Sequence, residues 1–366
     1  MMTQRERLMA RLACAIAALA LCGFAGRQYF GDPSGRNPGD PQFAKSQTEC
    51  LRVRDLAVPA ADAPSPATAA GLQGCSSEAL YYGVGVKADP VKARQCAVLE
   101  LRDPQKQNLP FAGAGMLMTI YANGRGAKKD LDLATHMACA TWDAPVDSNT
   151  LVLALQARKT NKSNEPFDYC RDVEQGYSNV SMAICAEFER RQADAIRNAR
   201  FAAIMAGWTP DERTAYAAVA NARDAFLALR QNDERNDNVM DRSAPSYFQM
   251  ELFDQQKTLL EKLTAGHGPV ANAGQRRVAD RELNAFYGQL IAALPEQGQI
   301  QIDRTGVRQT QRAWITYRDA WLTFVARKWP GASGDGLATF LTRKRLGDLH
   351  CDAYRNGDER FEQECG

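Results

Sequence analysis

Cysteines are the residues of this 366-residue chain whose type and spacing most clearly allow chemistry. Ten are present, and eight lie beyond residue 25, at Cys50, Cys75, Cys96, Cys139, Cys170, Cys185, Cys351 and Cys365. Their number is even and no two stand in a Cys-x-x-Cys arrangement, which favours disulfide pairing in an oxidising compartment. Order along the chain suggests neighbouring pairs: Cys50–Cys75, Cys96–Cys139, Cys170–Cys185 and Cys351–Cys365. Zinc binding is the alternative, but the three histidines provide no ligand spacing.

Groups that could support catalysis are scattered. His136 falls in an expected helix, His267 in a Gly-His-Gly-Pro loop, and His350 beside a cysteine. No serine has the surroundings of a nucleophile elbow, and no two carboxylates are marked as a pair for glycoside chemistry. The sequence therefore predicts a protein that is not an enzyme, with no catalytic residues, no metal and no cofactor.

The first 25 residues predict export. Arg5, Arg7 and Arg11 precede an apolar run of about fourteen residues, from Leu12 to Ala25, which matches a signal-peptide core and is too short to span a bilayer. Small residues at positions 23 and 25 favour cleavage after residue 25. Lipidation at Cys22 is one alternative, although a bulky leucine precedes it, and an uncleaved anchor is the other. We expect a periplasmic or secreted protein with no membrane span in its mature form.

Charge also limits the partners. The leader holds three arginines and one glutamate, so 42 basic and 42 acidic residues remain of the 45 and 43 in the whole chain. A neutral mature protein gives no electrostatic reason to expect nucleic acid or an anionic membrane as its ligand. A protein partner is the expectation, and the oligomeric state stays open.

Composition then divides the chain into segments. Residues 26–73 are rich in proline, alanine and glycine, which predicts an extended, poorly ordered linker. Beyond it, residues 83–89 (Gly-Val-Gly-Val-Lys-Ala-Asp) are echoed 41 positions later by residues 124–130 (Gly-Arg-Gly-Ala-Lys-Lys-Asp). Each copy predicts a helix that ends in a Gly-x-Gly turn, followed by an aspartate that caps the next helix. A phosphate-binding loop is the alternative, but no strand precedes the glycines and no Lys-Ser/Thr follows them.

With tyrosines at 81, 82 and 121 just before the glycines, these copies resemble SEL-like repeats, which are relatives of the tetratricopeptide repeat. The resemblance covers roughly residues 74–143 and is placed within a segment at 74–165. It implies stacked helix pairs that present a surface for protein binding.

A second, longer echo spans the remainder. Residues 194–201 recur as 280–287, and residues 223–226 recur as 318–321. The shared order favours a duplication, with a degenerate helical unit at 166–265 and a better preserved one at 270–366. In the second copy Trp314, Tyr317, Trp321 and Phe324 follow spacings of three, four and three, which predicts one buried stripe on a helix.

The second copy resembles the LprI-type domain, named for a lysozyme-inhibitor lipoprotein. The residues that carry the resemblance are Asp280, Asn284, Tyr287, Gln311, Arg312, Trp314, Tyr317, Arg318, Asp319 and Arg345. The family commonly has a cysteine where this chain has Trp321, and an early cysteine is also missing, so the disulfide that usually joins its helices is in doubt here. The resemblance implies protein binding, with lysozyme inhibition as the specific hypothesis.

Two further expectations concern charged residues near this domain. An ion pair between Arg318 and Asp280 would clamp two helices together, whereas a ligand-contacting Arg318 is the alternative. The segment between Cys351 and Cys365 is net acidic and, if closed by a disulfide, would present negative charge that could steer a basic lysozyme. A solvated tail stapled by a disulfide is the simpler interpretation.

The fold expected is all-α, with SEL-like or tetratricopeptide-like helical repeats followed by antiparallel helical-bundle LprI-type units. The function expected is non-enzymatic protein binding by an exported envelope protein, with inhibition of a lysozyme or related muramidase as the specific hypothesis. A periplasmic scaffold or adaptor that uses the repeats is the alternative, and a cell-wall enzyme is the third hypothesis.

Overall fold

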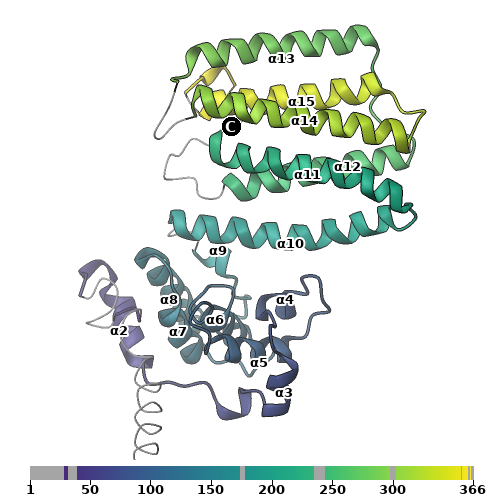
Figure 1. Cartoon of the computed structure of the whole chain (residues 1–366). Helices are drawn as coiled ribbons and strands as arrows, with labels where there is room; N and C mark the ends of the chain where they lie inside the picture. Colours follow the sequence, from purple (N-terminus) through teal and green to yellow (C-terminus); the bar gives the residue numbers. More distant parts are fainter. Residues whose placement is uncertain are drawn as a thin grey trace, which may run out of the picture. The chain divides into compact units, whose positions relative to one another are not determined.

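The structure, a computed structural model, describes residues 29–31, 39–173, 178–234, 244–296, 302–355, 357–361 and 363. All regular elements within these ranges are helices, which confirms the all-α class (Figure 1). The chain forms two compact units, residues 1–184 and 185–366. The predicted signal peptide, residues 1–25, lies outside the described residues.

Unit 1 is a succession of short helices. They are α2 (Ala44–Val53), α3 (Pro66–Gly71), α4 (Ser77–Tyr82), α5 (Pro90–Glu100), α6 (Gly113–Asn123), α7 (Leu131–Ala140), α8 (Pro145–Thr160) and α9 (Tyr169–Val173). From α4 to α9 each helix packs on the next one along the chain, and α6 is buried along almost its whole length. This order is that of stacked helix pairs.

The two Gly-x-Gly turns of unit 1 have the predicted geometry. Gly83 ends α4 and Gly124 ends α6, both in the left-handed conformation that glycine adopts without strain. The Asp89 carboxylate accepts a hydrogen bond from the backbone at the start of α5, and Asp130 does the same for α7. The second glycine of the later turn, Gly126, lies so close to α5 that a Cβ atom would be 2.2 Å from the carbonyl oxygen of Pro90. The predicted order of a helix, a Gly-x-Gly turn and an Asp-capped helix is thus confirmed in both copies. The assignment of these copies to SEL-like repeats stays a prediction.

The expected linker at residues 26–73 is corrected where the structure describes it. Residues 44–53 and 66–71 are helical, and α2 packs on α7 and α8. Phe30 is fully buried, and its backbone N–H donates to the carbonyl oxygen of Cys139 at 2.9 Å. The Tyr29 hydroxyl donates to the carbonyl oxygen of Cys50 at 3.1 Å. Composition had predicted disorder, but tertiary contacts and a disulfide hold this segment to unit 1.

The disulfides of unit 1 differ from the expected pairs. Cys50 bonds to Cys139, with 5.7 Å between the Cα atoms, and Cys75 bonds to Cys96, with 6.1 Å. The expectations Cys50–Cys75 and Cys96–Cys139 are therefore wrong. They assumed that neighbours in sequence are neighbours in space, whereas α2 folds back onto α7. Cys170, Cys185 and Cys351 are also disulfide-bonded; the Cys170–Cys185 pair stays a prediction, and Cys365 lies outside the described residues.

Unit 2 contains long helices that lie side by side (Figure 1). They are α10 (Asn179–Met205), in which the boundary with unit 1 falls, α11 (Pro210–Asp233), α12 (Ala244–Thr264), α13 (Ala273–Ala293), α14 (Arg304–Lys328) and α15 (Gly334–Arg355). Side-chain caps begin three of them: Thr209 and Asn272 form capping boxes, and Asp303 caps α14.

The core of unit 2 is an aromatic seam where α11 and α14 cross in antiparallel directions. Phe226 stacks on Tyr317 with ring centroids 5.9 Å apart, and Tyr216 meets Trp321 edge-on at 6.3 Å. The predicted stripe of Trp314, Tyr317, Trp321 and Phe324 is buried throughout, at 3% exposure or less. Residues from both predicted units, 166–265 and 270–366, thus share a single core.

The two halves of unit 2 repeat the same order of three helices, α10–α12 and α13–α15. Matching residues also make matching local contacts. Arg223 pairs with Asp224 at 2.7 Å in the first half, and Arg318 pairs with Asp319 at 2.8 Å in the second. These parallels support the duplication inferred from the sequence echo.

Candidate functional site

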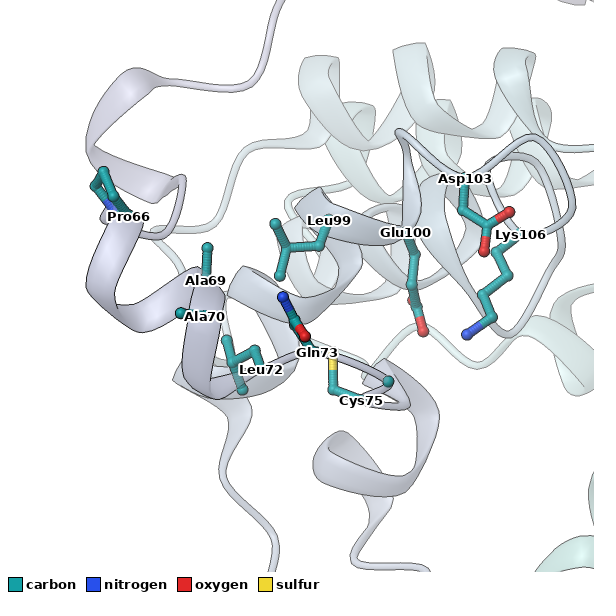
Figure 2. Close-up of a pocket in the computed structure, with 11 residues that line it drawn as sticks. Pro66, Ala69, Ala70, Leu72, Gln73, Cys75, Leu99, Glu100, Asp103 and Lys106 are labelled. Atoms are coloured by element: carbon teal, nitrogen blue, oxygen red, sulfur yellow. The ribbon is translucent and has the colours of Figure 1, made fainter.

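A pocket of about 460 Å³ in unit 1 lies between α3 and α5, beside the Cys75–Cys96 disulfide (Figure 2). Figure 2 shows Ala69, Ala70 and Leu72 on one side and Glu100, Asp103 and Lys106 on the other. Glu100 is buried and its carboxylate is fully used by the fold.

The Glu100 carboxylate accepts hydrogen bonds from the backbone N–H of Ser77 at 3.2 Å, from that of Gly113 at 3.0 Å and from the Ser77 hydroxyl. It therefore joins the starts of α4 and α6 to the end of α5. With both oxygens committed, its role here is structural, and the pocket lacks a free carboxylate from this residue.

One residue of the family motif, Arg345, belongs to a buried ionic cluster of unit 2, and a second, Gln311, binds it. The charged members of the cluster are Arg230, Glu234, Arg345, Asp348 and Asp352. Arg345 is completely buried, and its Nε donates to Oε1 of Gln311 at 2.9 Å. One of its Nη atoms donates to Glu234 Oε2 at 2.8 Å. Arg230 of α11 pairs with Asp348 of α15 at 3.1 Å. The cluster thus ties α11, α14 and α15 together.

Burial controls the electrostatics of this cluster. Loss of hydration raises the pKa of Asp348, although the neighbouring guanidiniums of Arg230 and Arg345 oppose it. Burial, followed by the charge of Glu234, raises the pKa of Asp352 well above its usual range. For Arg230 burial acts to lower the pKa, but the nearby carboxylates, Asp348 first, outweigh it and raise the pKa. The arginines stay charged, and Asp352 is favoured in its neutral form.

Sequence reasoning missed most of this cluster. Glu234 lies in a run of polar and charged residues, which is typical of exposed segments, and Asp352 was expected in a solvated acidic tail. Instead, both side chains are only 1% exposed. No local pattern marks either residue, because their partners lie on helices distant in sequence. Only Gln311 and Arg345 carried a signal, through the family motif.

The remaining motif residues have structural or surface positions. The expected Arg318–Asp280 clamp is wrong: Arg318 pairs with Asp319 and lies over the ring of Trp314, 5.2 Å from its centroid. Asp280 instead accepts a hydrogen bond from the Thr342 hydroxyl at 3.3 Å. A neighbour one position along the chain offers Arg318 a closer carboxylate than the adjacent helix does. Tyr287 packs against the core, whereas Asn284 and Arg312 are exposed.

The acidic tail is only partly as expected. Asp352 is buried, and Asp358 accepts a hydrogen bond from Arg360 Nε at 2.7 Å. Glu362, Glu364 and Cys365 lie outside the described residues. Steering of a basic partner by Asp352 is therefore excluded, because its carboxyl does not face solvent.

The three histidines lie in unlike settings. His136 accepts or donates a hydrogen bond at 3.2 Å with the Tyr29 hydroxyl, and burial lowers its pKa. His350 stacks on Phe361 with ring centroids 4.2 Å apart. His267 is exposed in the loop that follows α12. Among the described residues, no three histidine, cysteine or carboxylate side chains converge as metal ligands.

A groove of about 890 Å³ in unit 2 runs between α12, α15 and the loop from α12 to α13. Leu259, Phe340 and Pro269 contribute apolar surface. Lys262, His267, Arg343 and Lys344 contribute exposed basic or titratable groups. A groove of this volume is in the range of clefts that bind other molecules.

Comparisons with known proteins locate one family. No curated protein and no solved structure matches the chain. Within the described ranges, no helix combines the length and the apolar character needed to cross a bilayer. Residues 272–349 match the family model described as Lysozyme inhibitor LprI. This segment contains α13, α14 and most of α15. It includes the α14 side of the aromatic seam, with Trp314, and the hydrogen bond between Arg345 and Gln311. The C-terminal part of the chain therefore contains a domain of the LprI lysozyme-inhibitor family.

Proposed function

We propose that this protein acts in the bacterial envelope by binding another protein, and that its partner is a lysozyme or related muramidase, which it inhibits. The observation that carries the proposal is the match of residues 272–349 to the lysozyme-inhibitor family. The arrangement of the motif supports a binding role: Trp314, Tyr317, Gln311 and Arg345 build a rigid interior, so the activity belongs to the surface that this interior holds in place.

Export to the periplasm or the cell exterior is part of this proposal. The Cys50–Cys139 and Cys75–Cys96 disulfides support an oxidising compartment, since reducing compartments keep such thiols free. The basic and apolar leader supports a secretory signal, with lipidation at Cys22 as the variant.

A scaffold or adaptor role for unit 1 is the second candidate. It is favoured by the stacked helix pairs α4–α5 and α6–α7, whose Gly-x-Gly turns support the resemblance to SEL-like repeats. Unit 1 also exposes Val91 of α5 and Trp142 after α7, which are apolar groups that a protein partner could cover. Both roles can coexist in one chain, because they use different units.

The test is a titration of lysozyme with the purified mature protein, residues 26–366, its disulfides intact. Cell-wall clearing at low salt reports the remaining lysozyme activity. We expect a saturable loss of activity, whereas undiminished activity at a large molar excess would remove the inhibitor proposal. A cross-linking pull-down from periplasm, compared with a chain lacking residues 75–145, tests the scaffold role. Incubation with purified peptidoglycan alone distinguishes an inhibitor from a cell-wall enzyme, which would release fragments.

A further inference from the structure

The loop between α12 and α13 (residues 265–272, hereafter the α12–α13 loop) is held firmly by its neighbours. The carbonyl oxygen of Pro269 approaches α15 so closely that a Cβ on Gly336 would lie 2.0 Å from it. The Ser333 hydroxyl donates to the carbonyl oxygen of Ala271 at 3.3 Å. At its end, Asn272 exchanges two hydrogen bonds with Gln275, at 2.9 and 3.0 Å, in a capping box. Contacts with α15, with Ser333 and with the start of α13 therefore hold the loop backbone in place.

This fixed loop projects an apolar side chain into solvent. Val270 is 88% exposed, against 69% for Ile196, the next most exposed of the large apolar residues described. His267 is exposed in the same loop. A side chain that projects from a fixed backbone loses little conformational entropy when a partner covers it, which favours binding.

The groove beside the loop carries uncompensated positive charge. Lys262, Arg343 and Lys344 are exposed, and none of them is in an ion pair with any residue that the structure describes. The groove also has two carboxylates, Glu251 and Asp254. Asp254, however, is already engaged by Arg197 at 3.3 Å and Lys257 at 3.6 Å. The free charge offered to a partner is therefore mainly positive.

We propose that the α12–α13 loop and this groove together dock on the catalytic cleft of the muramidase, an inference that rests on the proposed function. Glycoside-cleaving enzymes line their clefts with a pair of carboxyl groups and an adjoining sugar-binding surface. Val270 enters the cleft where a sugar ring would lie, and the cations of the groove rim face the cleft carboxylates. Pairing of these local charges would fix the orientation of the loop in the cleft.

The experiment measures the dissociation constant between lysozyme and the mature protein, with and without a chitin trisaccharide that occupies the cleft. Two surface variants are compared with the wild type: Val270→Asp, and Arg343→Glu combined with Lys344→Glu. Matched controls make the same changes elsewhere on unit 2: Ile196→Asp, and Arg281→Glu combined with Arg312→Glu. All the altered side chains are exposed, and thermal melts confirm that each variant is folded.

We expect each surface variant to weaken binding about tenfold or more and each control to change it less than about twofold. Val270→Asp would bury an unpaired carboxylate in the interface, and the charge reversals would set like charges against the cleft carboxylates. Saturating trisaccharide should weaken binding of the wild type by competition. The cleft-docking inference would be overturned if the surface variants bind like the wild type. It would also be overturned if the trisaccharide has no effect on binding. Neither result would contradict the inhibition of lysozyme itself.

Two other outcomes reject it for different reasons. If the wild type neither binds nor inhibits lysozyme, the proposed function falls and the docking inference falls with it. If sedimentation shows that the wild type self-associates and Val270→Asp abolishes this, the groove is an interface between two copies of this chain.

Discussion

Arg345 of α15 donates from Nε to Oε1 of Gln311 of α14 at 2.9 Å, so two residues 34 positions apart in the matched domain meet in its interior. The other side of the same guanidinium binds Glu234, which follows α11. One arginine therefore fastens the matched domain to the preceding helices of unit 2. This contact explains why the motif identifies a family without supplying a reactive group.

Loss of the Arg345 side chain should be costly. Arg345→Met leaves Glu234 buried without its partner, and breaking such a pair typically costs about 3–5 kcal/mol. Urea unfolding followed by tryptophan fluorescence would measure this, because Trp314 and Trp321 lie in the same unit. Arg312→Met, at an exposed site in the same motif, is the control and should change stability by less than about 0.5 kcal/mol. Equal effects of the two substitutions would contradict the cluster's structural role.

The buried Asp352 should make unit 2 less stable as the pH rises. Its pKa is raised in the folded state, so the folded protein holds this proton more tightly than the unfolded chain does. Stability from this group is therefore full below the unfolded pKa of about 3.9 and falls as the pH climbs through the raised folded pKa. Asp352→Asn removes the titration, so its stability relative to the wild type should increase over that window. A pH-independent difference between the two proteins would contradict the assignment.

Removal of the Cys50–Cys139 disulfide should destabilise unit 1 more than removal of Cys75–Cys96. The two bridges join residues that are 89 and 21 positions apart. Because a disulfide lowers the entropy of the unfolded chain, the first should stabilise the fold by about 4–5 kcal/mol and the second by about 3 kcal/mol. Paired serine substitutions and chemical denaturation measure both values. Peptide mapping of the unreduced protein checks the connectivity directly: a Cys50–Cys75 peptide would contradict the observed packing of α2 on α7.

The second Gly-x-Gly turn provides a matched pair of substitutions. Gly126→Ala would place a methyl group 2.2 Å from the Pro90 carbonyl oxygen at a positive φ, and it should cost more than about 3 kcal/mol. Gly85→Ala meets open space at a similar positive φ and should cost only about 1 kcal/mol. Thermal melts of unit 1 would rank them. Identical melting temperatures would show that the turn does not pack on α5 in this way.

Local patterns in the sequence were sufficient for the helices and the main seam. The spacing of Trp314, Tyr317 and Trp321 reports a buried helical stripe directly, and Gly83 with Asp89 marks the end of one helix and the start of the next. These features depend on residues within a few positions of one another. Local reasoning is reliable there because the physical interaction itself is local.

Contacts between distant segments were not predictable in the same way. Cys139 pairs with Cys50 because α2 returns to α7, and nothing near either cysteine encodes that return. Proline-rich composition similarly hid the burial of Phe30. In the groove, Lys262 and Arg343 read as ordinary solvated charges, and only the antiparallel placement of α12 and α15 brings them to one surface.

Inhibition of lysozyme by the disulfide-bonded mature protein tests the central claim most directly. Residual activity should fall along a saturable curve as the protein is added, and Val270→Asp should shift that curve about tenfold while Ile196→Asp leaves it in place. Lysozyme that keeps its full activity at a large molar excess of folded protein would contradict the account.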